Sequence, residues 1–274
     1  MFARLEAKLP ELRKKPIASP VELKKLFDAS ELGDRPLVLH PIVHGERVYA
    51  IVLRAVGDTS VVQFVGVPLA GGEHEVLGKV TIPERFGSTH AGQNTFVTAA
   101  CTDRNSYFAA IRGVGIVEFG LRAQRQSILV RGEWLPTGVI GSLALAGGQL
   151  YVGMNGGKLL RAKMMTGQVD TLASTNVNVV KSALDDRPPF DLPIMLADDA
   201  RNRLLIIVQD RHDTGRGAEI WQLSTKTHEL SLLQTLGRIQ LGLTASLQDD
   251  VLTLSDTWFL RWNLKSDDIT VVAS

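Results

Sequence analysis

The chain has 274 residues, and its 30 Lys and Arg residues against 29 Asp and Glu residues leave a formal net charge of +1. That balance excludes the large basic excess typical of proteins that bind nucleic acids or anionic membranes. Hydrophobic residues make up 45% of the chain, as in a folded globular protein, and the one cysteine excludes a disulfide framework or a zinc cluster built on several cysteines.

Residues 1–35 are predicted to form a short helical segment before the main domain. Ser19-Pro20-Val21-Glu22 has the form of a capping box, in which the Ser19 hydroxyl accepts a hydrogen bond from the N–H of Glu22. Leu23, Leu26 and Phe27 then follow at helical spacing. The segment is either a helical appendage packed on the main domain or a docking arm.

Neither a secretory signal nor a membrane-spanning helix is expected. Charged residues, Pro or Gly interrupt every apolar run before it reaches the ~7–15 residues of a signal or the ~18–20 residues of a membrane helix. If Met1 is the natural start of the chain, the protein is expected in the cytoplasm; otherwise its location is open.

From residue 36 onward the sequence predicts short strands that repeat as one unit. In the clearest copy, Gly147-Gly148 and Asn155-Gly156 are hairpin turns that join apolar runs, and Thr166-Gly167 turns the chain into a fourth strand. Four further copies are readable, each with a second and a third strand. These strands lie at 107–111 with 115–119, at 203–208 with 219–223, at 251–254 with 259–262 and, less regularly, at 47–52 with 61–65.

Four strands in a unit of roughly 40–50 residues is the period of a β-propeller blade. A single four-stranded blade does not bury both of its faces, so neighbouring blades must stack and supply each other's core. A β-sandwich would use only about seven strands, and a doubly wound sheet would need helices between its strands. The sequence therefore predicts an all-β domain over residues 36–274.

Three elements of the clearest copy carry a resemblance to known repeats. Leu150-Tyr151-Val152-Gly153, Gly156-Gly157-x-Leu-Leu-Arg161 and Thr166-Gly167-x-Val169 resemble repeats of the broad quinoprotein-like and regulator-type β-propeller superfamily. The resemblance implies a propeller of four-stranded antiparallel blades and no specific family. No blade ends in the Trp-Asp dipeptide of WD40 repeats, and the tryptophan docking pattern of true quinoprotein repeats is missing, so no cofactor is expected.

About five blades are readable. They form either a complete small ring or the C-terminal part of a larger propeller.

Two segments of the fourth unit are predicted to form a charged rim on one face. In a propeller, the loops between blades share a face with the loops joining the two middle strands, and binding sites often use such loops. Segment 181–191 is a connector between blades, and segment 209–217 lengthens the hairpin between the middle strands. The candidate binding residues in them are Asp185, Asp186, Arg187, Asp191, Asp210, Arg211, His212, Asp213 and Arg216.

The chemistry of this rim is open to three interpretations. His212 between carboxylates has the components of a general base or of a hard-metal site. The same residues also suit a binding rim, or an ordinary solvated loop in which Asp and Arg pair with each other. Connector 80–94, with Arg85, His90 and Asn94, falls on the same face with the same alternatives.

Other residues that attract notice are expected to be structural. Pro41 lies between His40 and His44, so these belong to a strand and a turn rather than to a helix face. Cys101 ends an apolar strand, as a buried thiol would. Trp221, Trp258 and Trp262 lie at or beside third strands, where large rings fill the space between blades.

The leading hypothesis is therefore a non-catalytic propeller scaffold that binds a protein or small ligand through one loop face. The alternatives are a propeller hydrolase or lyase acting at the channel mouth, with His212 and nearby aspartates as acid–base or metal groups, and a C-terminal fragment of a larger propeller protein. Neither nucleic acid nor a membrane is an expected partner.

Overall fold

The computed structural model describes residues 36–83, 97–135, 140–154, 159–172, 194–209, 218–235, 244–255 and 259–273. The helical segment predicted at residues 1–35 lies outside these residues. Within them, the only helical elements are two short 3-10 turns, η2 (Gly132–Trp134) and η3 (Asp199–Arg201). No helix in the described part of the chain is long and apolar enough to span a membrane.

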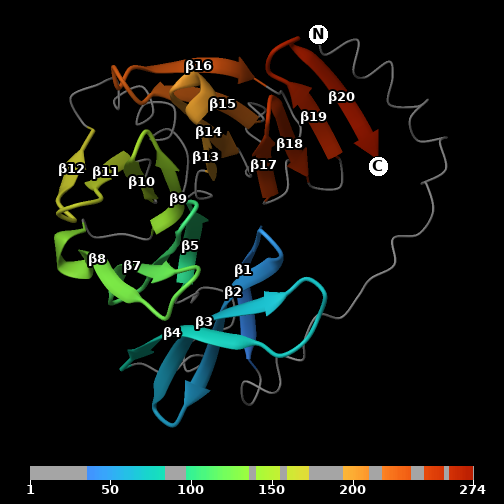
Figure 1. Ribbon diagram of the computed structural model, residues 1–274. Helices are drawn as coiled ribbons and strands as arrows, with labels where there is room; N and C mark the ends of the chain where they lie inside the picture. Colours follow the sequence, from blue (N-terminus) through green and yellow to red (C-terminus); the bar gives the residue numbers. More distant parts are fainter. Residues whose placement is uncertain are drawn as a thin grey trace. The chain divides into compact units, whose positions relative to one another are not determined.

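Five antiparallel sheets of four strands each follow one another along the chain, and each uses four consecutive strands in order (Figure 1). Sheet 1 contains β1 (Leu37–His44), β2 (Arg47–Val56), β3 (Thr59–Pro68) and β4 (Glu75–Ile82). Sheet 2 contains β5 (Val97–Thr102), β6 (Ser106–Ile111), β7 (Gly115–Gly120) and β8 (Gln126–Arg131). Sheet 3 contains β9 (Ile140–Ala146), β10 (Gln149–Met154), β11 (Leu159–Lys163) and β12 (Val169–Thr171). Sheet 4 contains β13 (Ile194–Asp198), β14 (Arg203–Gln209), β15 (Ala218–Ser224) and β16 (Leu230–Thr235). Sheet 5 contains β17 (Thr244–Gln248), β18 (Val251–Ser255), β19 (Phe259–Asn263) and β20 (Asp268–Ala273).

These sheets confirm the repeat that the sequence predicts. The second and third strands of all five units lie where the hairpin pattern placed them, because tight turns between apolar runs fix the register of an antiparallel pair. The chain divides into two compact units. The sheet 1–2 unit comprises Glu22–Leu145 and Ala162–Val169, and the sheet 4–5 unit comprises Met1–Val21, Ala146–Arg161 and Asp170–Ser274.

In each unit, the first strand of one sheet lies beside the first strand of the next. These neighbours are β1 and β5 in the sheet 1–2 unit and β13 and β17 in the sheet 4–5 unit. Sheets 4 and 5 share an apolar core whose buried members are Leu205, Ile207, Ile220, Leu252, Leu254, Leu260 and Trp262. Stacking therefore buries the faces that no single sheet covers by itself.

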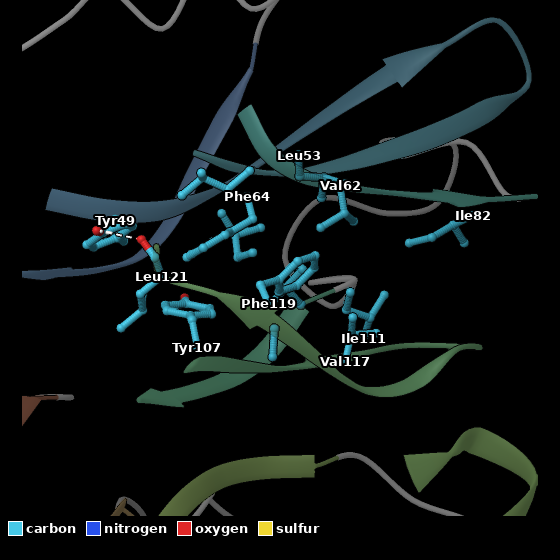
Figure 2. Close-up of a cluster of buried hydrophobic side chains, with 14 residues drawn as sticks. Tyr49, Leu53, Val62, Phe64, Ile82, Tyr107, Ile111, Val117, Phe119 and Leu121 are labelled. Atoms are coloured by element: carbon cyan, nitrogen blue, oxygen red, sulfur yellow. Dashed lines mark hydrogen bonds between the residues drawn. The ribbon is translucent and has the colours of Figure 1, made fainter. Parts of the chain in front are cut away.

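Aromatic rings fill the core between sheets 1 and 2 (Figure 2). The Phe64 ring lies 4.7 Å from the ring centroid of Tyr107 and 5.1 Å from that of Phe119. Both buried tyrosines satisfy their hydroxyls: Tyr49 donates to the carbonyl oxygen of Leu121 at 2.9 Å, and Tyr107 donates to that of His40 at 2.9 Å. Each of these bonds joins one sheet to the other, so the ring packing and the hydrogen bonds specify the same sheet-to-sheet register.

Gly78 on β4 permits the closest approach in this core. A Cβ added there would lie 2.5 Å from Cδ1 and 2.8 Å from Cε1 of the Phe119 ring. Because Phe119 is fully buried, its ring has no open space to move into. The absence of a side chain at residue 78 thus sets the spacing between β4 and β7.

We predict that Gly78→Ala lowers the free energy of unfolding by about 1–3 kcal/mol, as overpacking of a close-packed core does. The midpoint of chemical denaturation measures this loss. Phe119→Leu supplies the control, because the double variant should lose less stability than the sum of the two single variants. Strictly additive losses would show that the ring does not limit the approach of β4.

Candidate functional site

The candidate rim predicted from the sequence is not among the described residues. All nine of its members lie outside the described ranges: Asp185, Asp186, Arg187, Asp191, Asp210, Arg211, His212, Asp213 and Arg216. Arg85, His90 and Asn94 of the other connector lie outside them as well. The charged binding rim therefore stays a prediction.

The residues expected to be structural are placed as such where the structure describes them. His40 belongs to β1, with its Nε2 3.2 Å from the carbonyl oxygen of Val97, and His44 is the last residue of β1 before a turn. Trp221 and Trp262 are buried. Burial raises the pKa of the Cys101 thiol, which keeps it protonated and unreactive at neutral pH.

Each sheet contributes one pair of residues that the sequence analysis missed. The first member lies two residues before the end of the third strand, and it faces a polar residue on the fourth strand. We call these pairs the polar row: Gly66 with Glu75, Glu118 with Ser127, Arg161 with Asp170, Gln222 with Ser231, and Arg261 with Thr270. The row lies at the strand ends opposite to those that carry the predicted rim.

The polar row forms hydrogen bonds within its sheets. In sheet 1, Nη2 of Arg47 donates to the Gly66 carbonyl oxygen at 3.2 Å and to Oε2 of Glu75 at 3.0 Å. In sheet 2, the Ser106 hydroxyl donates to Oε1 of Glu118 at 2.6 Å, and the same oxygen accepts from Arg125. Because Glu118 is already paired with Arg125, this Ser–Glu pair is a structural contact rather than a nucleophile with a free base.

Asp198 forms the most buried charged cluster of the sheet 4–5 unit. Its side chain is 1% exposed and accepts from Nε of Arg203 at 2.8 Å and from Nη1 of Arg201 at 3.2 Å. Arg201 also reaches Oδ1 of Asp250, in the turn between β17 and β18, at 2.5 Å. Arg203 donates from Nη1 to Oε1 of Gln222 at 2.7 Å and so connects the cluster to the polar row. The cluster thereby ties sheet 4 to sheet 5.

A second polar cluster of the same unit surrounds Arg161 on β11. Its Nη2 donates to Oδ2 of Asp170 at 3.1 Å, and its Nη1 lies 2.9 Å from Nε2 of His228, in the turn between β15 and β16. A guanidinium only donates, so His228 must accept as a neutral imidazole with its proton on Nδ1. Desolvation, and secondarily the charge of Arg161, lowers the pKa of His228 and favours that neutral form.

Both clusters have the chemistry of structural ties between sheets. Their guanidiniums are already paired with carboxylates, and the one imidazole is engaged by an arginine rather than by a hydroxyl or thiol. Within the described ranges, no group of three or more His, Cys, Asp or Glu side chains could hold a metal ion. These contacts therefore stabilise sheet stacking.

The sequence did contain a signal for the polar row. Alignment of the repeats places Arg161 over Arg261, each as the third residue of an apolar-Leu-Arg run. The remaining copies have Gly66, Glu118 and Gln222 at this position. Charge therefore varies from copy to copy, and only the coordinates show that the fourth-strand partner is polar in all five.

We predict that Asp198→Ala lowers the free energy of unfolding by about 3 kcal/mol, because it leaves the guanidinium of Arg203 buried without its carboxylate. Urea denaturation measures the loss. Glu133→Ala is the matched control, since its 3.7 Å pair with Arg131 is exposed on both sides and should contribute less than about 1 kcal/mol. Equal losses in the two variants would contradict a structural role for Asp198.

We also predict that the contribution of His228 to stability falls as the solution is acidified. Its pKa in the folded chain is below the unfolded value of 6.5, so the unfolded chain takes up the proton first. This contribution is complete above pH 6.5 and is lost as pH falls through the lowered pKa. His228→Asn removes the titrating group, and asparagine tolerates the positive φ of 58° at this position.

Urea midpoints at several pH values between about 7.5 and 5 test this prediction. The native chain should lose more stability on acidification than the His228→Asn variant, because other groups titrate equally in both. Identical pH profiles would contradict the neutral, hydrogen-bonded state of His228.

Comparison with known proteins identifies the architecture. No family model and no curated protein sequence matches the chain. Among solved structures, Sqt1 of Saccharomyces cerevisiae matches with a TM-score of 0.53 at 13% identity, over 86% of this chain and 61% of that chain. BamB from Moraxella catarrhalis matches with a TM-score of 0.45 at 12% identity, over 87% of this chain and 63% of that chain. The WD40 repeats of RRP9 match with a TM-score of 0.43 at 13% identity, over 66% of this chain and 52% of that chain.

The chain thus spans between about half and two thirds of the length of these solved structures. At such low identity, the match to Sqt1 indicates the fold alone. Five consecutive four-stranded antiparallel sheets agree with that fold. The chain has the generic repeat architecture of a β-propeller, and no specific family is shown.

Proposed function

We propose that this chain is a non-catalytic β-propeller scaffold that binds a protein or small ligand through one loop face. One observation carries the proposal: a single four-stranded unit is repeated five times, and its described charged clusters are used to join one sheet to another. Within each unit, stacked sheets of this kind hold their connecting loops at fixed positions, where loops commonly bind partners.

The loop face in question is the one opposite the polar row. At the polar-row end of sheet 4, the β15–β16 turn is short and internally bonded, since the N–H of His228 donates to the carbonyl oxygen of Ser224 at 2.9 Å. The inserted segments 181–191 and 209–217 belong to the other strand ends, and their Asp, Arg and His212 side chains are the residues proposed to contact the partner. Charged rims of this kind govern specificity and association rate.

We predict that neutralising this rim weakens partner binding while the fold is kept. One variant replaces Asp185, Asp186, Asp210 and Asp213 by Asn, and a second replaces Arg187, Arg211 and Arg216 by Gln. Crosslinking with mass spectrometry identifies partners of the native chain, and at least one of the two variants should weaken binding of such a partner by about tenfold or more.

The control is Lys226→Ala, which removes an exposed charge from the β15–β16 turn on the opposite strand ends. It should bind like the native chain. Full retention of every partner by both rim variants would overturn the proposed binding face. Thermal melting of all variants separates a loss of binding from a loss of folding.

A further inference from the structure

The outer edge of sheet 1 has no neighbouring strand among the described residues, and side-chain amides occupy part of it. Nε2 of Gln124 donates to the Val76 carbonyl oxygen at 3.4 Å. The strand order β1-β2-β3-β4 leaves β4 hydrogen-bonded to a neighbouring strand on one side only. The side chain of Gln126, at the start of β8, bonds the other side: its Oε1 accepts from the Lys79 backbone N–H at 2.7 Å, and its Nε2 donates to the Lys79 carbonyl oxygen at 2.8 Å. A side-chain amide thus occupies this edge as the peptide group of an added strand would.

Among the described residues, the same geometry leaves the backbone of Thr81 without a partner on that edge. Outward-pointing backbone groups recur at every second residue of an antiparallel strand, so those of Thr81 point the same way as those of Lys79. Thr81 is exposed, and no described residue forms a hydrogen bond with its backbone on this edge. An edge of this kind is a ready template for another extended chain.

An apolar cavity opens beside Thr81. It has a volume of about 300 Å³ and lies between β4 and the β7–β8 hairpin, with Val80, Val114, Val117 and Ile128 as its apolar lining. Ile128 is 54% exposed, which is unusual for so large an aliphatic side chain. The volume is at the lower limit of small-molecule pockets, which suits one large side chain better than a whole ligand.

The opposite face of β4 carries a cation. Val80 lies on the core side of the strand, so its neighbours Lys79 and Thr81 present their side chains on the other side. Lys79 is exposed and forms no ion pair with any described residue. A strand added to this edge at Thr81 would place one residue towards the cavity, and the flanking residue opposite Thr81 would lie on the same face as Lys79.

We propose that the β4 edge at Thr81 binds an extended peptide in which an aliphatic residue is flanked by acidic residues. The peptide backbone pairs with Thr81 as Gln126 pairs with Lys79, the aliphatic side chain enters the cavity, and a flanking carboxylate pairs with Lys79. Main-chain bonds supply affinity and the alternating side chains supply specificity, as in β-strand addition generally. This surface is separate from the loop rim of the proposed function.

The test uses two fluorescein-labelled heptapeptides, Gly-Ser-Glu-Leu-Glu-Ser-Gly and Gly-Ser-Lys-Leu-Lys-Ser-Gly, titrated with the full chain by fluorescence anisotropy. The native chain should bind the Glu peptide at least about tenfold more tightly than the Lys peptide. Lys79→Glu should reverse that preference. Equal affinity for both peptides, or a preference unchanged by Lys79→Glu, would overturn the proposal.

Backbone pairing is tested by Thr81→Pro, which removes the outward N–H, with Thr81→Ala as the matched control that keeps it. Proline is tolerated on edge strands where its nitrogen faces outward. Thr81→Pro should weaken binding of the Glu peptide by about tenfold and Thr81→Ala should not. Equal binding by the two variants would overturn strand addition, and the charge reversal at Lys79 remains a test if Thr81→Pro does not fold.

A second copy of this chain is the competing occupant of the edge. Sedimentation that shows a dimer, dissociated by Thr81→Pro but not by Thr81→Ala, would overturn the peptide proposal in favour of self-pairing. The rim variants of the loop face should bind the Glu peptide like the native chain. Loss of partner binding in the rim variants tests the loop face, and binding of the Glu peptide tests the β4 edge, so either proposal can fail without the other.

Discussion

Burial of both faces of a sheet is the constraint on which the rest of this structure depends. In β3, every residue from Ser60 to Val67 is buried, although successive side chains point to opposite faces of the strand. The six residues of β6 are likewise all buried. A sheet with such central strands is stable only when other parts of the chain cover both faces, so each unit of the repeat depends on its neighbours.

Stacking of this kind forces polar groups into places where water is scarce. The strand ends at the polar row carry charged and amide side chains close to the sheet cores. Asp198 is the clearest case, because its carboxylate is nearly inaccessible and yet carries a charge that Arg201 and Arg203 compensate. Asp250 and His228 extend such contacts from one sheet to the turn of another. The charged side chains that the structure describes at these strand ends thus specify how sheets stack.

The outer strands differ from the central strands because one edge of each has no neighbouring strand in its sheet. An edge strand has backbone groups that no partner strand bonds, and proteins commonly cover such edges. Here Gln124 and Gln126 bond the backbone of β4 at Val76 and Lys79, and no described residue bonds the outward backbone groups of Thr81 beside the apolar cavity. The same repeat that hides its central strands therefore exposes an edge suited to recognition of an extended chain.

The strands, their order and the four-stranded unit were readable from the sequence, because hairpin turns such as Gly147-Gly148 and the alternation of apolar residues are local signals. The side-chain contacts that join the sheets were not readable. Arg161 was visible as a repeated position, but its partners are Asp170 and His228, the second of which is 67 residues away along the chain. Gln126 and Lys79 are 47 residues apart, and neither residue type suggests an edge-capping amide. Local pattern determines which strands form and which face of each is apolar; the pairing of distant side chains is decided only when the sheets stack, because stacking brings those residues together.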